Sequence, residues 1–225
     1  VCSSDLRNKV KTREQWLEDI VDKLEEKIKK MKARNGMLRD EIAQKTIEIL
    51  KTREEKGGIK QFLDAIKSEY PEVRIFAANK LAAHKNNDVI TAFHGLISDH
   101  NADMRVLAAK VLGEIGDDSG LKPLTQALKD KDAKVRISAA SALGKLGNKE
   151  AEAGLLSALQ DQENSVRCAV AEALGEIEAQ DAVEVLIPFL SDKDPQVKES
   201  VIVALGKIRD EKSIDSLIAS LKDEE

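Results

Sequence analysis

Aromatic residues are rare in this chain, with one Trp and one Tyr among 225 residues and an aromatic content of 3%. Proteins that bind single-stranded nucleic acid stack bases on aromatic side chains, so this composition argues against that class. Cysteine is equally scarce, with only Cys2 and Cys168. Cys168 falls within an apolar helical pattern, where a thiol usually serves as a small buried residue. We therefore expect neither a disulfide framework nor a Cys-based metal site.

Long apolar runs and recognisable catalytic motifs are also missing from the sequence. No run approaches the ~20 apolar residues that span a bilayer, and no secretory signal pattern is visible, so we expect no membrane contact and a cytoplasmic location. None of His84, His94 and His100 has a second ligand at the spacing of a helical metal site. Phosphate-binding, dinucleotide-binding and nucleophile-elbow motifs do not occur. We expect no catalytic residue, no cofactor and no metal, and hence a protein that is not an enzyme.

Positive charge is in short supply over most of the chain. Residues 57–225 carry 21 Lys and Arg against 29 Asp and Glu, whereas residues 1–56 carry 15 against 12. The resulting net charge of −8 on the longer segment opposes contact with the phosphate backbone of nucleic acids. We therefore expect no nucleic-acid partner.

The dominant feature of the sequence is repetition with a fixed step of 31 residues, such as the step from Asp99 to Asp130. This 31-residue step relates three arginines, four glycines and five aspartates, namely Arg105, Arg136, Arg167, Gly113, Gly144, Gly175, Gly206, Asp99, Asp130, Asp161, Asp192 and Asp223. Such a period is typical of a solenoid, whose small units bury their apolar faces against their neighbours. The sequence divides into a leading half unit at 57–67, a worn unit at 68–98, and clear units at 99–129, 130–160, 161–191 and 192–222.

Within a unit the apolar residues follow a helical period. In the unit at 130–160, Val135, Ala139 and Leu143 mark one face of a first helix. Gly147-Asn148 then provides a helix end and a new N-cap, and a second apolar stretch follows at 155–159. The sequence therefore predicts an all-α fold: a right-handed α-solenoid of about five 31-residue helix-turn-helix repeats, preceded by a long amphipathic or coiled-coil helix.

The segment 130–144 reads Asp-Lys-Asp-Ala-Lys-Val-Arg-Ile-Ser-Ala-Ala-Ser-Ala-Leu-Gly. This pattern resembles the short HEAT-like repeats of the phycobilisome-lyase type, and the resemblance covers roughly residues 57–222. It implies a stack of helix pairs, but the family includes chromophore lyases, adaptor subunits and proteins of unknown role, so it does not fix a function. Two alternatives to a protein-binding scaffold follow. One is an accessory subunit of a chromophore (bilin) lyase, and the other is a nucleic-acid-binding HEAT protein similar to the HEAT-like DNA glycosylases, which the charge disfavours.

The repeated charges predict a structural ladder. Each cation has an Asp in register, in its own or the adjacent unit, so we interpret the set as pairs that hold the stack together: Asp99, Arg105, Asp130, Arg136, Asp161, Arg167, Asp192 and Lys198. The repeated glycines are also assigned to the scaffold, because a residue without a side chain lets neighbouring helices approach.

Partner contacts should come from residues that change from unit to unit while facing away from the core. Lys122, Gln126 and Lys129 are spaced four and three residues apart, which places them on one helix face opposite the leucines of the same helix. The stripe that they define with their counterparts comprises Thr91, Lys122, Gln126, Lys129, Ser157, Gln160, Glu184, Ser191, Asp215 and Lys222. We predict that it contacts another protein, with an ordinary solvated face as the alternative.

Residues 10–50 follow a heptad instead of the 31-residue step. The core positions are Leu17, Val21, Leu24, Ile28, Met31, Asn35, Leu38, Ile42 and Ile49. β-Branched residues at a with Leu at d favour a parallel two-stranded coiled coil, and an Asn at a fixes its register. We therefore predict a homodimer through residues 10–50. Two alternatives stay open: an antiparallel hairpin that turns at Asn35-Gly36, and an apolar stripe that caps the first repeat.

The chain thus divides into three parts. Residues 1–6 read Val-Cys-Ser-Ser-Asp-Leu, which resembles the translation of a sequencing-library adapter, and we expect them to be non-native. A coiled-coil or helical-hairpin segment occupies 7–56, and the solenoid occupies 57–225. Together these patterns predict a non-enzymatic scaffold or adaptor that binds another protein in the solenoid groove and is dimerised or tethered by its N-terminal helix.

Overall fold

A computed structural model describes residues 13–222 of the chain. Within this range, the side chains of residues 13–22, 25, 28–29, 32, 52–57 and 221–222 are outside the description. The adapter-like residues 1–6 and the ladder residue Asp223 also lie outside it.

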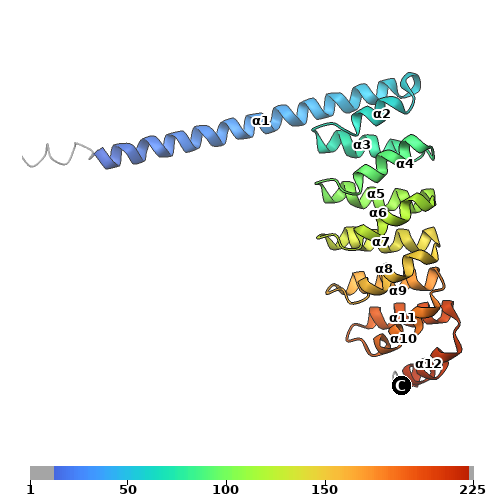
Figure 1. Cartoon of the computed structure of the whole chain (residues 1–225). Coiled ribbons are helices and arrows are strands. Elements are labelled where there is room, and N and C mark those ends of the chain that lie inside the picture. Colours follow the sequence, from blue (N-terminus) through green and yellow to red (C-terminus); the bar gives the residue numbers. More distant parts are fainter. Residues whose placement is uncertain (1–12, 223–225) are drawn as a thin grey trace, which may run out of the picture.

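Every element in the described range is helical, and the helices stack in pairs into a column (Figure 1). The five pairs are α3 (Pro71–Leu81) with α4 (Asn87–Leu96), α5 (Ala102–Ile115) with α6 (Leu121–Ala127), α7 (Ala133–Leu146) with α8 (Glu152–Ala158), α9 (Asn164–Glu176) with α10 (Val183–Leu186), and α11 (Pro195–Ile208) with α12 (Ile214–Lys222). Two helices precede them: α1 (Arg13–Gly57) and α2 (Lys60–Ala65). The predicted all-α solenoid of helix pairs is confirmed.

Short 3₁₀ helices flank the second helix of most pairs. They are η1 (Asp118–Gly120), η2 (Lys149–Ala151), η3 (Gln180–Ala182), η4 (Ile187–Ser191) and η5 (Glu211–Ser213). The helix α10 is the shortest second helix because Pro188 follows it, and a proline lacks the N–H that would continue the α-helical hydrogen bonds.

The core lies between the layer of first helices and the layer of second helices. One leucine of each first helix recurs with the 31-residue step, and all five are at most 2% exposed: Leu81, Leu112, Leu143, Leu174 and Leu205. From the second helices, Leu124 and Leu155 are completely buried against them. Since each pair shares its apolar surface with its neighbours, the repeats form one continuous core.

The first helices pack closely because glycines lie where they meet. A methyl group added to Gly113 in α5 would lie 2.7 Å from Cα of Ala142 in α7, and one added to Gly175 in α9 would lie 2.8 Å from Cα of Ala204 in α11. Both distances are well inside van der Waals contact. The repeated glycines therefore set the spacing between successive repeats.

The helix α1 runs through Asn35-Gly36 without a break and packs its C-terminal half on α2 and α3. Ala43 and Leu50 are buried, and Arg39 pairs with Glu69 at 3.4 Å. The remainder of α1 extends beyond the column (Figure 1).

The docked face of α1 differs from its heptad stripe. Docking uses Ala43, Ile47 and Leu50, which fall at b and f positions. Heptad core residues on the other face are 47–53% exposed, namely Leu24, Met31, Leu38, Ile42 and Ile49. The side chains of Leu17, Val21 and Ile28 lie outside the described residues.

No helix within 13–222 combines the length and the hydropathy that a bilayer-spanning segment needs.

Candidate functional site

In the described part of the chain, four buried ion pairs connect successive repeats. Each arginine of a first helix reaches the ladder Asp of the next repeat: Arg74–Asp99 at 3.3 Å, Arg105–Asp130 at 2.7 Å, Arg136–Asp161 at 2.7 Å and Arg167–Asp192 at 3.1 Å. Arg74 belongs to this set although it comes from the worn first unit. Lys198 continues the register, but the Asp in the equivalent position after it is Asp223, outside the described residues.

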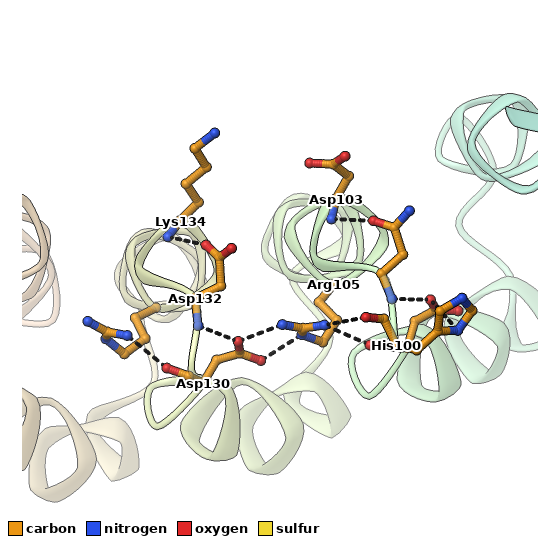
Figure 2. Close-up of polar contacts among 9 residues, drawn as sticks. His100, Asp103, Arg105, Asp130, Asp132 and Lys134 are labelled. Carbon is orange, nitrogen blue, oxygen red and sulfur yellow. Dashed lines mark hydrogen bonds and ion pairs between the residues drawn. The ribbon is translucent and has the colours of Figure 1, made fainter. Parts of the chain in front are cut away.

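The contacts of Arg105 show how one such pair joins two repeats (Figure 2). Its Nε and Nη2 each donate to an oxygen of Asp130 at 2.7 Å, while Nη1 donates to the backbone oxygen of Asp99 at 2.8 Å. Asp130 also accepts from the backbone N–H of Asp132, whose own carboxylate accepts from Lys134 N at the start of α7. The arginine thus holds the loop of its own repeat and the entry of the next first helix together.

The carboxylates of Asp130, Asp161 and Asp192 are ionised at neutral pH although they are largely covered. Burial alone would raise the pKa of Asp130, but hydrogen bonds from Arg105 and from the backbone N–H of Asp132 outweigh it and hold that pKa below its usual value. Asp161 and Asp192 have lowered pKa values from the same balance, with Arg136 and Arg167 as the partners. These charges are neutralised inside the scaffold and are not offered to a partner.

The second helices form an open hollow of about 860 Å³ between α6 and α8. Five residues of the predicted stripe line it: Lys122, Gln126, Lys129, Ser157 and Gln160. All five are exposed. Gln126 in α6 and Ser157 in α8 are one repeat apart, and so are Lys129 and Gln160, which follow the ends of these two helices. We call this hollow the α6–α8 groove.

The rest of the predicted stripe lies elsewhere. Thr91 lines a second hollow of about 670 Å³ beside Leu63 and Arg74. Glu184 is paired with Lys212 at 2.8 Å, and Ser191 and Asp215 are exposed but line neither hollow. The side chain of Lys222 lies outside the described residues. The stripe is therefore concentrated at one place and does not run evenly along the column.

Sequence reasoning missed four polar residues of the α6–α8 groove: Thr125, Lys131, Glu150 and Gln162. Lys131 and Gln162 lie in the loops that follow α6 and α8, one repeat step apart. Their signal in the sequence is the 31-residue step itself, which continues two positions beyond Lys129 and Gln160.

One arrangement brings a serine, a histidine and a carboxylate together. Ser119 Oγ lies 3.3 Å from Nε2 of His94, on the preceding repeat, but the hydroxyl donates to Asp117. Asp117 caps η1 through the backbone N–H of Ser119, and these two hydrogen bonds lower its pKa. A nucleophilic serine requires the carboxylate to orient the histidine, so this contact is a capped turn. Within the described residues, no group of three His, Cys, Asp or Glu could hold a metal ion.

The geometry defines the class of the protein as an α-solenoid of short helix pairs. The HEAT repeat family matches residues 92–153 and 152–225, which together make up more than half of the sequence. The chain belongs to the HEAT repeat family. A comparison with curated proteins gives no match.

Solved structures share this fold. The complex of CpcE and CpcF of phycocyanin lyase from Nostoc sp. PCC7120 is 24% identical, with a TM-score of 0.62, and the match covers 73% of this chain and 70% of that one. A designed armadillo repeat protein in complex with the peptide (KR)4 is 16% identical, with a TM-score of 0.56 and coverage of 73% and 88%. An engineered protein is 20% identical, with a TM-score of 0.54 and coverage of 74% and 86%.

Proposed function

We propose that this chain is a non-enzymatic scaffold that binds a segment of another protein in the α6–α8 groove. The observation that carries the proposal is the separation of two kinds of residue. Those that repeat identically, such as Arg105 and Gly113, are buried in contacts between repeats. Those that change from repeat to repeat, such as Lys122 and Gln126, are exposed around an open hollow. A solenoid uses such a variable surface for recognition.

Two similar structures support a role in binding proteins. The designed armadillo repeat protein holds a peptide, and CpcE and CpcF form a complex with each other. An open hollow of about 860 Å³ has room for several residues of an extended chain.

The proposal includes dimerisation through α1. The stripe of Leu24, Met31, Leu38, Ile42 and Ile49 is exposed although it has the composition of a two-stranded seam. The solenoid packs on the opposite b and f positions, so a second copy can pair with the stripe while each α1 stays docked on its own first repeat. Asn35 at an a position would select the parallel dimer.

Selection of peptides against the full chain tests the groove. A displayed library of short random peptides should yield binders to the wild-type protein, and Lys122→Glu with Lys129→Glu should abolish their binding. Lys110→Glu with Lys145→Glu is the matched control, because it changes net charge equally at exposed residues of α5 and α7 that do not line this groove. If no selected peptide depends on the groove residues, the proposed function is wrong.

A second candidate is an accessory subunit of a chromophore lyase. The similarity to CpcE and CpcF favours it, since both the fold and the short repeats are shared. Co-expression with a bilin and an acceptor protein, followed by absorbance spectroscopy, tests this candidate. The absence of both a covalent adduct and a bound pigment would count against it.

A further inference from the structure

The α6–α8 groove carries an excess of unpaired positive charge. Lys122, Lys129 and Lys131 line it and are exposed, and none makes an ion pair with any residue in the described part of the chain. Arg136 and Asp161 also line the groove, but they neutralise each other, and Asp130 is neutralised by Arg105. Glu150 is the one acidic lining residue left outside the ladder. The charges available to a ligand are therefore three positive and one negative.

The adjacent repeats do not carry this positive charge at the equivalent positions. The positions equivalent to Lys122, Lys129 and Lys131 hold Thr91, Ser98 and His100 in the preceding repeat, and Ala153, Gln160 and Gln162 in the following one. The segment 57–225 as a whole has a net charge of −8. A basic site on an acidic molecule repels basic ligands at close range and favours acidic ones in the groove. Since neither adjacent repeat has a lysine at these positions, the stacking of one repeat on the next does not explain them.

Neutral hydrogen-bonding groups lie beside the lysines. Gln126, Gln160 and Gln162 are exposed in the groove, and their side-chain amides bond to no residue of the described part of the chain. A glutamine amide both donates and accepts, which matches the alternating N–H and C=O groups of an extended backbone. Packed helices lie about 8–10 Å apart and an extended chain rises about 3.3 Å per residue, so about three residues reach from α6 to α8.

We infer that the α6–α8 groove binds an extended, acidic segment of a partner protein, with Lys122, Lys129 and Lys131 paired to Asp or Glu side chains and the glutamines bonded to its backbone. This inference rests on the proposed function and names the chemistry of the partner. The partner segment inferred here has the opposite charge to the (KR)4 peptide in the complex of the designed armadillo repeat protein.

The same peptide selection, followed by fluorescence anisotropy, tests this inference separately from the proposed function. Peptides that require the groove should be enriched in Asp and Glu. A labelled acidic peptide from the selection should bind the full chain at least about tenfold more tightly than peptides of the same length in which Gln or Lys replaces each acidic residue. Lys122→Glu with Lys129→Glu should weaken the acidic peptide by about tenfold or more, whereas Lys110→Glu with Lys145→Glu should change its affinity less than about twofold. Added salt should weaken binding, because exposed charges are screened.

Each other result has one meaning. If groove-dependent peptides are selected but are basic or neutral, the inference is wrong and the proposed function stands. If the acidic peptide binds but the control variant weakens it equally, the attraction is not located in the groove, and the inference is wrong. If no selected peptide depends on the groove, both the inference and the proposed function fail.

Discussion

Adding one methyl group at two equivalent glycines should have opposite effects on stability. Gly113 in α5 and Gly206 in α11 occupy the same position of the repeat, two residues before the end of their helices. The new Cβ at Gly113 meets Cα and Cβ of Ala142 at 2.7 Å, whereas the one at Gly206 meets nothing within 4 Å. The two substitutions therefore differ in packing and share the same change in helix propensity.

The magnitude follows from two terms. Alanine is favoured over glycine in a helix by up to about 1 kcal/mol, and this term stabilises both variants. Overpacking costs about 1–3 kcal/mol, and at Gly113 it cannot be relieved by a side-chain rotation because the nearest atom belongs to the backbone of α7. Gly206→Ala should thus stabilise the protein by up to about 1 kcal/mol, and Gly113→Ala should lie about 1–3 kcal/mol below it in free energy of unfolding.

Thermal and urea unfolding followed by circular dichroism measure this difference. For a chain of this size it corresponds to a gap of roughly 2–12 °C between the melting temperatures of the two variants. Gly144→Ala should fall between them, because its Cβ would lie 3.1 Å from Cα of Ala173. Equal shifts in Gly113→Ala and Gly206→Ala would refute the argument that the glycines set the spacing of the repeats.

Three further predictions concern the ladder and α1. Arg105→Ala leaves the buried Asp130 without its cation and should lower the free energy of unfolding by about 1–3 kcal/mol. Lys207→Ala removes an exposed pair with Glu176 and should lower it by less than about 1 kcal/mol. Urea unfolding compares the two variants, and equal losses would contradict the structural role of the ladder. The pKa values of Asp130, Asp161 and Asp192 are lower in the folded protein than in the unfolded chain. Their contribution to stability is therefore complete above the unfolded value of about 3.9 and is lost as pH falls through the folded values. Melting temperatures measured from pH 7 to pH 2 should drop below about pH 4, and the drop should be smaller in Arg105→Ala. Leu38→Asp should convert a dimer of the full chain at tens of micromolar into a monomer. Met37→Asp changes a more exposed apolar residue outside the heptad core and should leave the chain dimeric. Light scattering measures both, and a monomeric wild-type protein would contradict dimerisation.

The repeat itself could be predicted from the sequence because scaffold residues are under the same physical constraint in every unit. The 31-residue step of Gly113, Leu143 and Arg136 with their counterparts reflects a close approach, a buried side chain and an ion pair that recur wherever two pairs stack. These are local rules repeated along one dimension, so one unit predicts the next.

The partner of each ladder arginine could not be predicted in the same way. An Asp in its own repeat and an Asp in the next repeat have the same register in the sequence. The structure pairs Arg136 with Asp161, of the next repeat, while its Nη1 donates to the backbone oxygen of Asp130 in its own. The choice depends on how one helix pair stacks on the next, which a periodic pattern does not contain.

The docked face of α1 and the position of the groove could not be predicted from the sequence either. Ala43, Ile47 and Leu50 do not belong to the heptad core, and their burial depends on how α1 packs on α2 and α3, which the heptad pattern does not contain. Lys122 and Gln126 of the predicted stripe line the hollow, but nothing in the sequence indicated that it would open between α6 and α8.

The central claim is that the groove residues serve binding while the ladder serves the fold. Thermal unfolding and anisotropy with the acidic peptide, measured together on two variants, test it most directly. Lys122→Glu with Lys129→Glu should lose binding by about tenfold or more and melt like the wild type. Arg167→Ala removes a ladder pair with Asp192 that does not line the groove, so it should lose about 1–3 kcal/mol of stability and keep its affinity below the melting transition. An Arg167→Ala protein that melts like the wild type but no longer binds would contradict the claim, because the two surfaces would then have the opposite roles.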